Sequence, residues 1–167
     1  GSSADWKTSG SGYGTSVALS SDGLTAVLGG PGVVTYTYGG GNYHQGAALA
    51  FSFNPITGNW SQKGSLITPI DGMSNDSFGQ SVALSSDGLT VIVGGPGDDV
   101  AGVTNQGSAR VFDWDAVSAQ WLQRGGTLTP ASGGANDGFG QAVALSADGR
   151  TAIVGGPGHD FNGHNDQ

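Results

Sequence analysis

The residues best suited to bind a cation lie near the C-terminal end of the chain, between His159 and Asp166. Asp160, Asn162, Asn165 and Asp166 offer side-chain oxygens around a glycine. Hard cations such as calcium prefer that kind of ligand. The sequence favours a loop in which these side chains bond their own backbone. A calcium site, with these four residues as its candidate ligands, is the alternative.

The loop at the equivalent place of an earlier segment, residues 98–105, keeps an aspartate at Asp99 but lacks the asparagine that follows. We therefore include Asp99 among the candidate metal ligands. Two further aspartates, Asp76 and Asp137, each stand two residues before a Phe-Gly pair. A carboxylate that recurs in this way is predicted to accept hydrogen bonds from backbone amides.

Aromatic residues supply a second kind of candidate site. Tyr36, Tyr38 and Tyr43, followed by His44, lie in a stretch that occurs once in the chain, and tyrosine suits recognition surfaces. We predict a ligand-binding patch here, for a glycan or a protein. Trp60 and Trp121 stand at equivalent positions of two segments. Packing between repeated units is the expected role of both, and stacking on sugar rings is the alternative.

Sequence motifs point to surface modification and away from catalysis. Asn59 and Asn75 begin N-glycosylation sequons, which favours an exported protein. Cysteine is absent, and neither a G-x-S-x-G nor an HExxH motif occurs. We therefore expect no enzymatic activity.

The charge of the chain limits its partners. Its net charge is −8, with only 5 lysines and arginines. Binding to nucleic acid requires clustered cations that neutralise phosphates, so we expect no nucleic-acid partner. No apolar run is long enough for a membrane helix, and we expect no membrane insertion.

The whole chain is organised by an internal repeat. Segments of the form F-G-Q-S-V-A-L-S-S-D-G-L-T begin at Tyr13, Phe78 and Phe139, 65 and 61 residues apart. A second segment, which starts with Gln-Gly and contains the tryptophan, begins at Gln45 and Gln106. The four additional residues of the first copy fall between Pro31 and Gln45, as expected for an insertion in a loop.

Each unit predicts four antiparallel strands, placed in the second copy at residues 79–85, 89–93, 108–114 and 120–128. The first two are joined by a tight Asp-Gly turn, in which glycine supplies a positive φ. The second strand is apolar on both faces, as in sheets that stack radially. The predicted fold class is therefore all-β, with β-propeller blades of four antiparallel strands, in a partial propeller of about 2.7 repeats.

The sequence pattern of the units resembles that of the FG-GAP repeat family, which is known from the head of the integrin α subunit. The resemblance depends on the pairs Phe78-Gly79 and Phe139-Gly140 and on the Gly-Gly-Pro triplets that follow them. It implies an extracellular or cell-surface location and a ring of about seven blades. Integrin blades often hold calcium between their first two strands, but here that turn has a single carboxylate. Asp22, Asp87 and Asp148 are therefore predicted to be turn residues.

We expect four segments: a partial outer strand or linker at 1–12, one blade at 13–77, a second at 78–138, and the first half of a third at 139–167. Such a set of blades does not close a ring, so we expect it to associate with itself or with other propeller segments. The leading functional hypothesis is a non-catalytic extracellular binding or adhesion scaffold. The alternatives are a lectin-like propeller, a structural subunit of a filament or coat, and an engineered propeller fragment.

Overall fold

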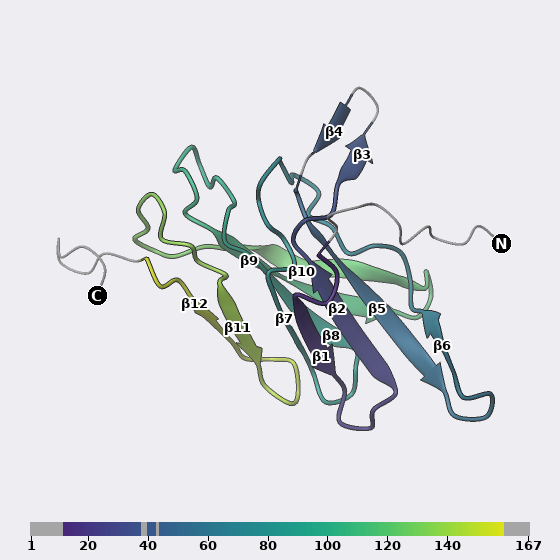
Figure 1. Cartoon of the computed structure of the whole chain (residues 1–167). Coiled ribbons are helices and arrows are strands. Elements are labelled where there is room, and N and C mark those ends of the chain that lie inside the picture. Colours follow the sequence, from purple (N-terminus) through teal and green to yellow (C-terminus); the bar gives the residue numbers. More distant parts are fainter. Residues whose placement is uncertain (1–11, 38–39, 43, 159–167) are drawn as a thin grey trace.

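The computed structural model describes residues 12–37, 40–42 and 44–158, and side-chain positions are described outside 35–43 (Figure 1). Within these residues all regular structure is β. The strands are β1 (Ser16–Leu19), β2 (Thr25–Gly30), β3 (Thr35–Thr37), β4 (Gly40–Asn42), β5 (Ala47–Asn54), β6 (Asn59–Gln62), β7 (Ser81–Leu84), β8 (Thr90–Gly95), β9 (Ser108–Asp115), β10 (Gln120–Leu128), β11 (Ala142–Leu145) and β12 (Ala152–Gly155). In this part of the chain no helix is long and apolar enough to cross a membrane.

Two sheets of four antiparallel strands form the body of the molecule. The first, which we name blade 1, has the order β1-β2-β5-β6. The second, blade 2, has the order β7-β8-β9-β10 and therefore repeats the same path. The hairpin of β11 and β12, which we name half-blade 3, repeats the first two strands of that path. The predicted all-β fold built of four-stranded blades is confirmed.

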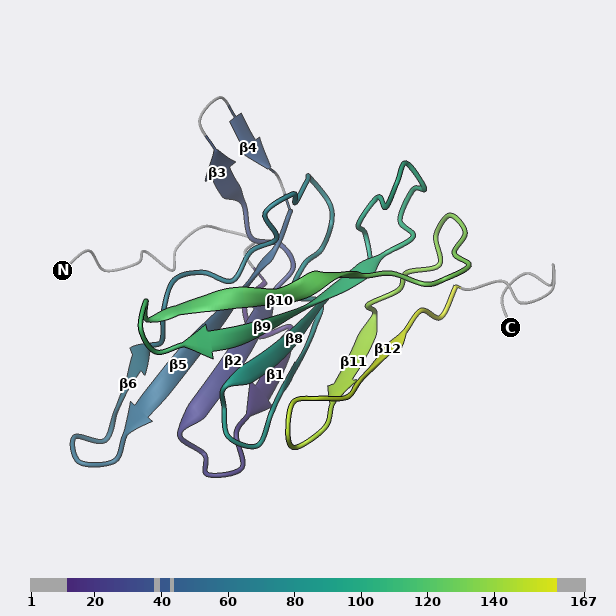
Figure 2. The same ribbon diagram turned by 180° about the vertical axis from the view of Figure 1, so that it is seen from behind.

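The inner strands of the blades lie side by side, with β7 between β1 and β11 (Figure 1). Figure 2 shows the sheets from behind, with β10 and β9 of blade 2 in front. Buried apolar residues form two cores, one between blade 1 and blade 2 and one between blade 2 and half-blade 3. Because β8 lies between both neighbours, all six of its residues are buried. This burial on both faces explains why the sequence of β8, TVIVGG, is almost continuously apolar.

The two ends of the blades differ in the length of their connections. At one end short turns join β1 to β2, β7 to β8, and β11 to β12 (Figure 1). At the other end lie the longer connections, including the β3–β4 hairpin, which projects beyond the sheets (Figure 1). The insertion predicted between Pro31 and Gln45 thus forms a hairpin of its own. We name this end, formed by residues 33–37, 40–42, 44–46, 69–77, 98–107 and 130–138, the rim.

Candidate functional site

The short turns use their repeated polar residues for the fold. In blade 2, Ser85 Oγ donates to Asp87 Oδ1 (2.6 Å), and the Leu89 amide donates to the same oxygen (3.0 Å). Both bonds favour the ionised carboxylate and lower the pKa of Asp87. Asp22 and Asp148 make the corresponding bonds with their own serines, Ser20 and Ser146. All three aspartates thus stabilise Asp-Gly turns.

The aspartates before the Phe-Gly pairs lie buried at the rim. Asp76 is 2% exposed and accepts a hydrogen bond from the Met73 amide (2.6 Å); Asp137 accepts one from the Gly134 amide (2.7 Å). Burial raises the pKa of Asp76 to about 6, and the negative charge of Asp98 adds to the effect. Both carboxylates close the loop that leads from one blade into the next.

The repeated Gln-Gly and Phe-Gly pairs join neighbouring blades directly. The Phe78 amide donates to the Gln45 carbonyl (2.8 Å), and the Phe139 amide donates to the Gln106 carbonyl (2.9 Å). The glycine after Gln45 has a φ of 86°, and a β-carbon there would lie 2.0 Å from the Phe78 carbonyl oxygen. Glycine is therefore required, since the backbones of two blades touch at this point.

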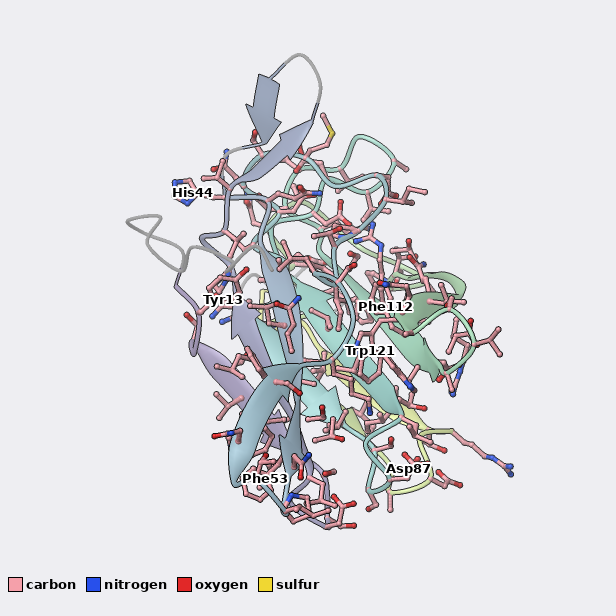
Figure 3. All side chains as sticks on the ribbon, turned by 90° about the vertical axis from the view of Figure 1, so that its right-hand side faces the viewer. Tyr13, His44, Phe53, Asp87, Phe112 and Trp121 are labelled. Atoms are coloured by element: carbon pink, nitrogen blue, oxygen red, sulfur yellow. The ribbon has the colours of Figure 1, made fainter. Side chains whose placement is uncertain are left out.

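The two equivalent tryptophans have different surroundings. Trp121 is 9% exposed, packs edge-on against Trp114 and donates from Nε1 to the Lys63 carbonyl of blade 1 (2.9 Å). Trp60 is 46% exposed and contacts only the ring of Phe53 among the described aromatic rings. In Figure 3, Trp121 lies in the middle of the molecule, whereas Phe53, the neighbour of Trp60, lies near the lower end. Trp121 is therefore a packing residue, whereas Trp60 lies on an open surface.

Two cationic groups at the junctions of the blades were missed by sequence reasoning. Lys63 of blade 1 donates to the Gly88 carbonyl in the turn of blade 2 (3.0 Å), and its ammonium lies over the Trp114 and Trp121 rings. Arg124, its equivalent in blade 2, donates to the Gly149 carbonyl of half-blade 3 (2.7 Å). The sequence does contain a signal for this role. Lys63 and Arg124 lie 61 residues apart, which is one repeat length, in a chain with only 5 lysines and arginines.

A buried arginine marks the junction of blades 1 and 2 at the rim. Arg110 is 2% exposed and pairs with Asp71 (2.7 Å) and Asp98 (3.1 Å). Its guanidinium also lies over the Phe78 ring. Asp71 belongs to the connection between the blades, so this network fastens that connection to blade 2. The equivalent of Arg110 in blade 1 is Leu49, and the network is therefore specific to one junction.

The rim also exposes apolar residues that the repeat does not explain. Ile70 is 98% exposed and Met73 is 64% exposed, and both lie in the connection from β6 to β7. The equivalent positions in blade 2 hold Ala131 and Gly134. The connection is held beside the inserted segment, because the Ser77 amide donates to the His44 carbonyl (3.3 Å).

Two residues of the predicted tyrosine patch, Tyr36 and His44, are described. Exposed His44 follows the β3–β4 hairpin and lies at the end opposite Asp87 (Figure 3). Tyr36 is in β3, within the range whose side chains are not described, and Tyr38 and Tyr43 lie outside the described residues. The backbone therefore places Tyr36 and His44 at the rim, and whether the four residues form a patch stays a prediction.

Most of the predicted metal loop, including Asp160, Asn162, Asn165 and Asp166, lies outside the described residues. Asp99 is exposed, and its Oδ1 accepts a hydrogen bond from the Asn105 amide (2.7 Å). In the described ranges no three histidine or acidic residues gather as metal ligands would. Both sequon asparagines are exposed: Asn59 begins β6, and Asn75 lies at the rim with a φ of 74°.

Comparisons with known proteins identify the family of the chain. A solved structure of the Pseudomonas aeruginosa periplasmic gluconolactonase PpgL matches at 16% identity and a TM-score of 0.41, over 92% of this chain. The chain spans 56% of the length of that protein. A search of curated protein sequences gives no match. The profile of the FG-GAP repeat matches residues 60–112 and 121–167, which together are more than half of the chain. The chain therefore belongs to the FG-GAP repeat family.

Proposed function

We propose that this chain is a non-catalytic binding scaffold of the cell surface or extracellular space, which holds a protein partner at the rim. The observation on which the proposal depends is the contrast between the two ends of the blades. The repeated aspartates of the short turns are engaged in the turns themselves. Exposed apolar residues at that end, Ile56 and Val117, occupy equivalent positions of the two blades. At the rim, by contrast, the copies differ, because exposed Ile70 and Met73 stand where blade 2 has smaller residues.

The chemistry of the rim favours a protein surface with apolar and basic groups. Solvent-exposed apolar residues that the fold does not require often mark interaction sites. Asp71 is 63% exposed and lies next to Ile70, and exposed Asp99 lies on the neighbouring rim segment. With a net charge of −8, the chain attracts cationic partners over neutral or acidic ones.

The experiment measures adhesion of beads that carry the chain to layers of intact cells. The double variant Ile70→Asp, Met73→Asp should lose adhesion, because it removes the apolar patch and leaves the buried contacts in place. Val117→Asp, at an exposed valine on the opposite end, is the control and should adhere normally. Adhesion that survives the double variant would refute the rim as the binding surface.

A panel of free monosaccharides, added during the same assay, distinguishes a glycan ligand from the proposed protein partner. Inhibition by one sugar would show that the ligand is a glycan, and would contradict the proposed protein partner. High salt should weaken adhesion if charge contributes as proposed, because ions screen exposed charges.

A further inference from the structure

The connection from β6 to β7, residues 69–77, has a backbone arrangement that recurs in blade 2 with smaller side chains. The Met73 amide donates to buried Asp76 (2.6 Å), and the Gly134 amide donates in the same way to buried Asp137 (2.7 Å). This turn is thus built with methionine in one copy and with glycine in the other. The side chain of Met73 is therefore not required by the turn itself.

The backbone of Met73 is held at a fixed place of the rim. On one side of it, Asp71 pairs with the Arg110 guanidinium of β9 (2.7 Å). On the other side, the Asp76 carbonyl accepts a hydrogen bond from the Gly97 amide (3.0 Å). Both anchors belong to blade 2, so the segment between them is fastened to that blade at each end.

The side chain of Met73 points away from these anchors into solvent. It is 64% exposed, and Ile70 in the same connection is 98% exposed. Blade 2 has Ala131 and Gly134 at the equivalent positions. Methionine suits a surface that a partner covers, because its unbranched thioether adapts to the shape of the partner.

The thioether of Met73 is also the single sulfur atom of the chain, which has one methionine and no cysteine. Hydrogen peroxide converts an exposed thioether into a sulfoxide. An S–O bond forms, the O–O bond of the peroxide breaks, and the second oxygen leaves as water with both hydrogens. The sulfur is oxidised and the peroxide is reduced. An apolar side chain thus becomes a polar one at the same place.

We propose that Met73 is an oxidation site at which hydrogen peroxide releases the partner from the rim. The inference rests on the function proposed above for this surface. The thioether packs against apolar groups of the partner, whereas the sulfoxide would bring a polar oxygen without a hydrogen-bond donor into that contact. Because the side chain lies mostly in solvent, its oxidation changes the surface and leaves the fold intact.

The experiment treats the purified chain with hydrogen peroxide, removes the peroxide, and repeats the adhesion of beads to intact cells. Peptide mass spectrometry should find one added oxygen atom on Met73. Adhesion should fall about tenfold, because burial of an unpaired polar group opposes binding. The circular dichroism spectrum and the unfolding midpoint should not change. The two stereospecific methionine sulfoxide reductases, supplied with a thiol, should restore adhesion.

Two variants separate this effect from general oxidative damage. Met73→Leu has no thioether, so peroxide should not change its adhesion relative to its own untreated sample. The double variant Met73→Leu, Gly134→Met moves the thioether to the equivalent position of blade 2, where a β-carbon would meet only Asp137 at ordinary contact distance. This variant should be oxidised and still adhere as its own untreated sample does.

The oxidation site would be refuted by an oxidised chain that adheres like the untreated one, or by a Met73→Leu variant that loses adhesion after peroxide. The variant Ile70→Asp, Met73→Asp distinguishes this failure from that of the proposed function. If adhesion survives in that variant, the rim is not the binding surface and both proposals fail. If that variant loses adhesion but the oxidised chain keeps it, the oxidation site alone fails. A chain that adheres to no cells contradicts both.

Discussion

At the closed junction, blade 2 packs one of its faces against blade 1. The equivalent face of blade 1, built from the same repeat, has no neighbour among the described segments, and its residues are more exposed. Trp121 at the junction is buried and donates a hydrogen bond to blade 1. Trp60, its equivalent, is 46% exposed. The same holds for the valines, because Val82 is partly buried and packs against the core, while Val17 is 68% exposed.

The repeat determines which residues each blade carries, and the neighbouring blade determines whether such a residue is buried or exposed. A buried aromatic contributes to stability through packing, whereas an exposed one on a preformed face is available for an intermolecular contact. Equivalent substitutions in the two regions should therefore have unequal effects.

The largest difference is expected for the two tryptophans. Trp121→Ala leaves a cavity beside Trp114 and removes the bond to the Lys63 carbonyl, and should lower the unfolding free energy by about 3–5 kcal/mol. Trp60→Ala should cost about 1 kcal/mol, because that side chain is already half in solvent. Urea denaturation of the monomer measures both values. Equal losses would contradict the distinction between the regions.

The polar part of the closed junction should respond to pH. The pKa of Asp76 is about 6 in the folded chain, above its usual value, because burial disfavours the charged form. This group therefore contributes stability that is complete below about pH 4 and is lost as the pH rises through 6. The loss amounts to about 2–3 kcal/mol.

Burial is the main cause of the raised pKa of Asp76; among the neighbouring charges, Asp98 and Asp99 raise this pKa further and Arg110 lowers it. Asp76→Asn keeps an oxygen for the Met73 amide but does not ionise, so the fall in unfolding free energy between pH 4 and pH 7 should become shallower by the same amount. Urea titrations at several pH values test this. An unchanged slope would show that Asp76 keeps its ordinary pKa.

A smaller effect is expected where the backbones of two blades meet. A β-carbon at Gly94 would lie 2.0 Å from the Gly140 carbonyl oxygen. Gly94→Ala should force the blades apart and lower the unfolding free energy by about 1–3 kcal/mol. Gly126→Ala is the control, because no atom lies within 4 Å of a β-carbon there and its φ is not positive. If Gly94→Ala left the unfolding free energy unchanged, the two blades would be packed less closely than described.

The repeat made most of the fold predictable from the sequence. The strand predicted at residues 120–128 is β10 with the same bounds, and the strand predicted at 108–114 is β9 with one more residue. The alternation of apolar residues and the Asp-Gly turns determine these elements locally. Contacts between blades are long-range, and the roles of Arg110 and Lys63 were for this reason not foreseen.

The candidate site was less predictable. The rim was indicated by the insertion with its tyrosines, since a segment without a repeat equivalent stands out in the sequence. The exposure of Ile70 and Met73 could not be predicted, because the burial of a loop side chain depends on which other segments pack against it. The unequal surroundings of Trp60 and Trp121 depend on which blade lies beside each of them, and nothing in their own segments encodes that.

Gly155→Ala tests most directly whether the neighbouring blade decides the role of a repeated residue. Gly155 is equivalent to Gly94, but a β-carbon there would meet only Ala142 at ordinary contact distance. We expect an unfolding free energy that is unchanged or slightly raised, in contrast to the loss expected for Gly94→Ala, and urea denaturation measures both. A Gly155→Ala variant destabilised as much as Gly94→Ala would contradict the role assigned to the neighbouring blade.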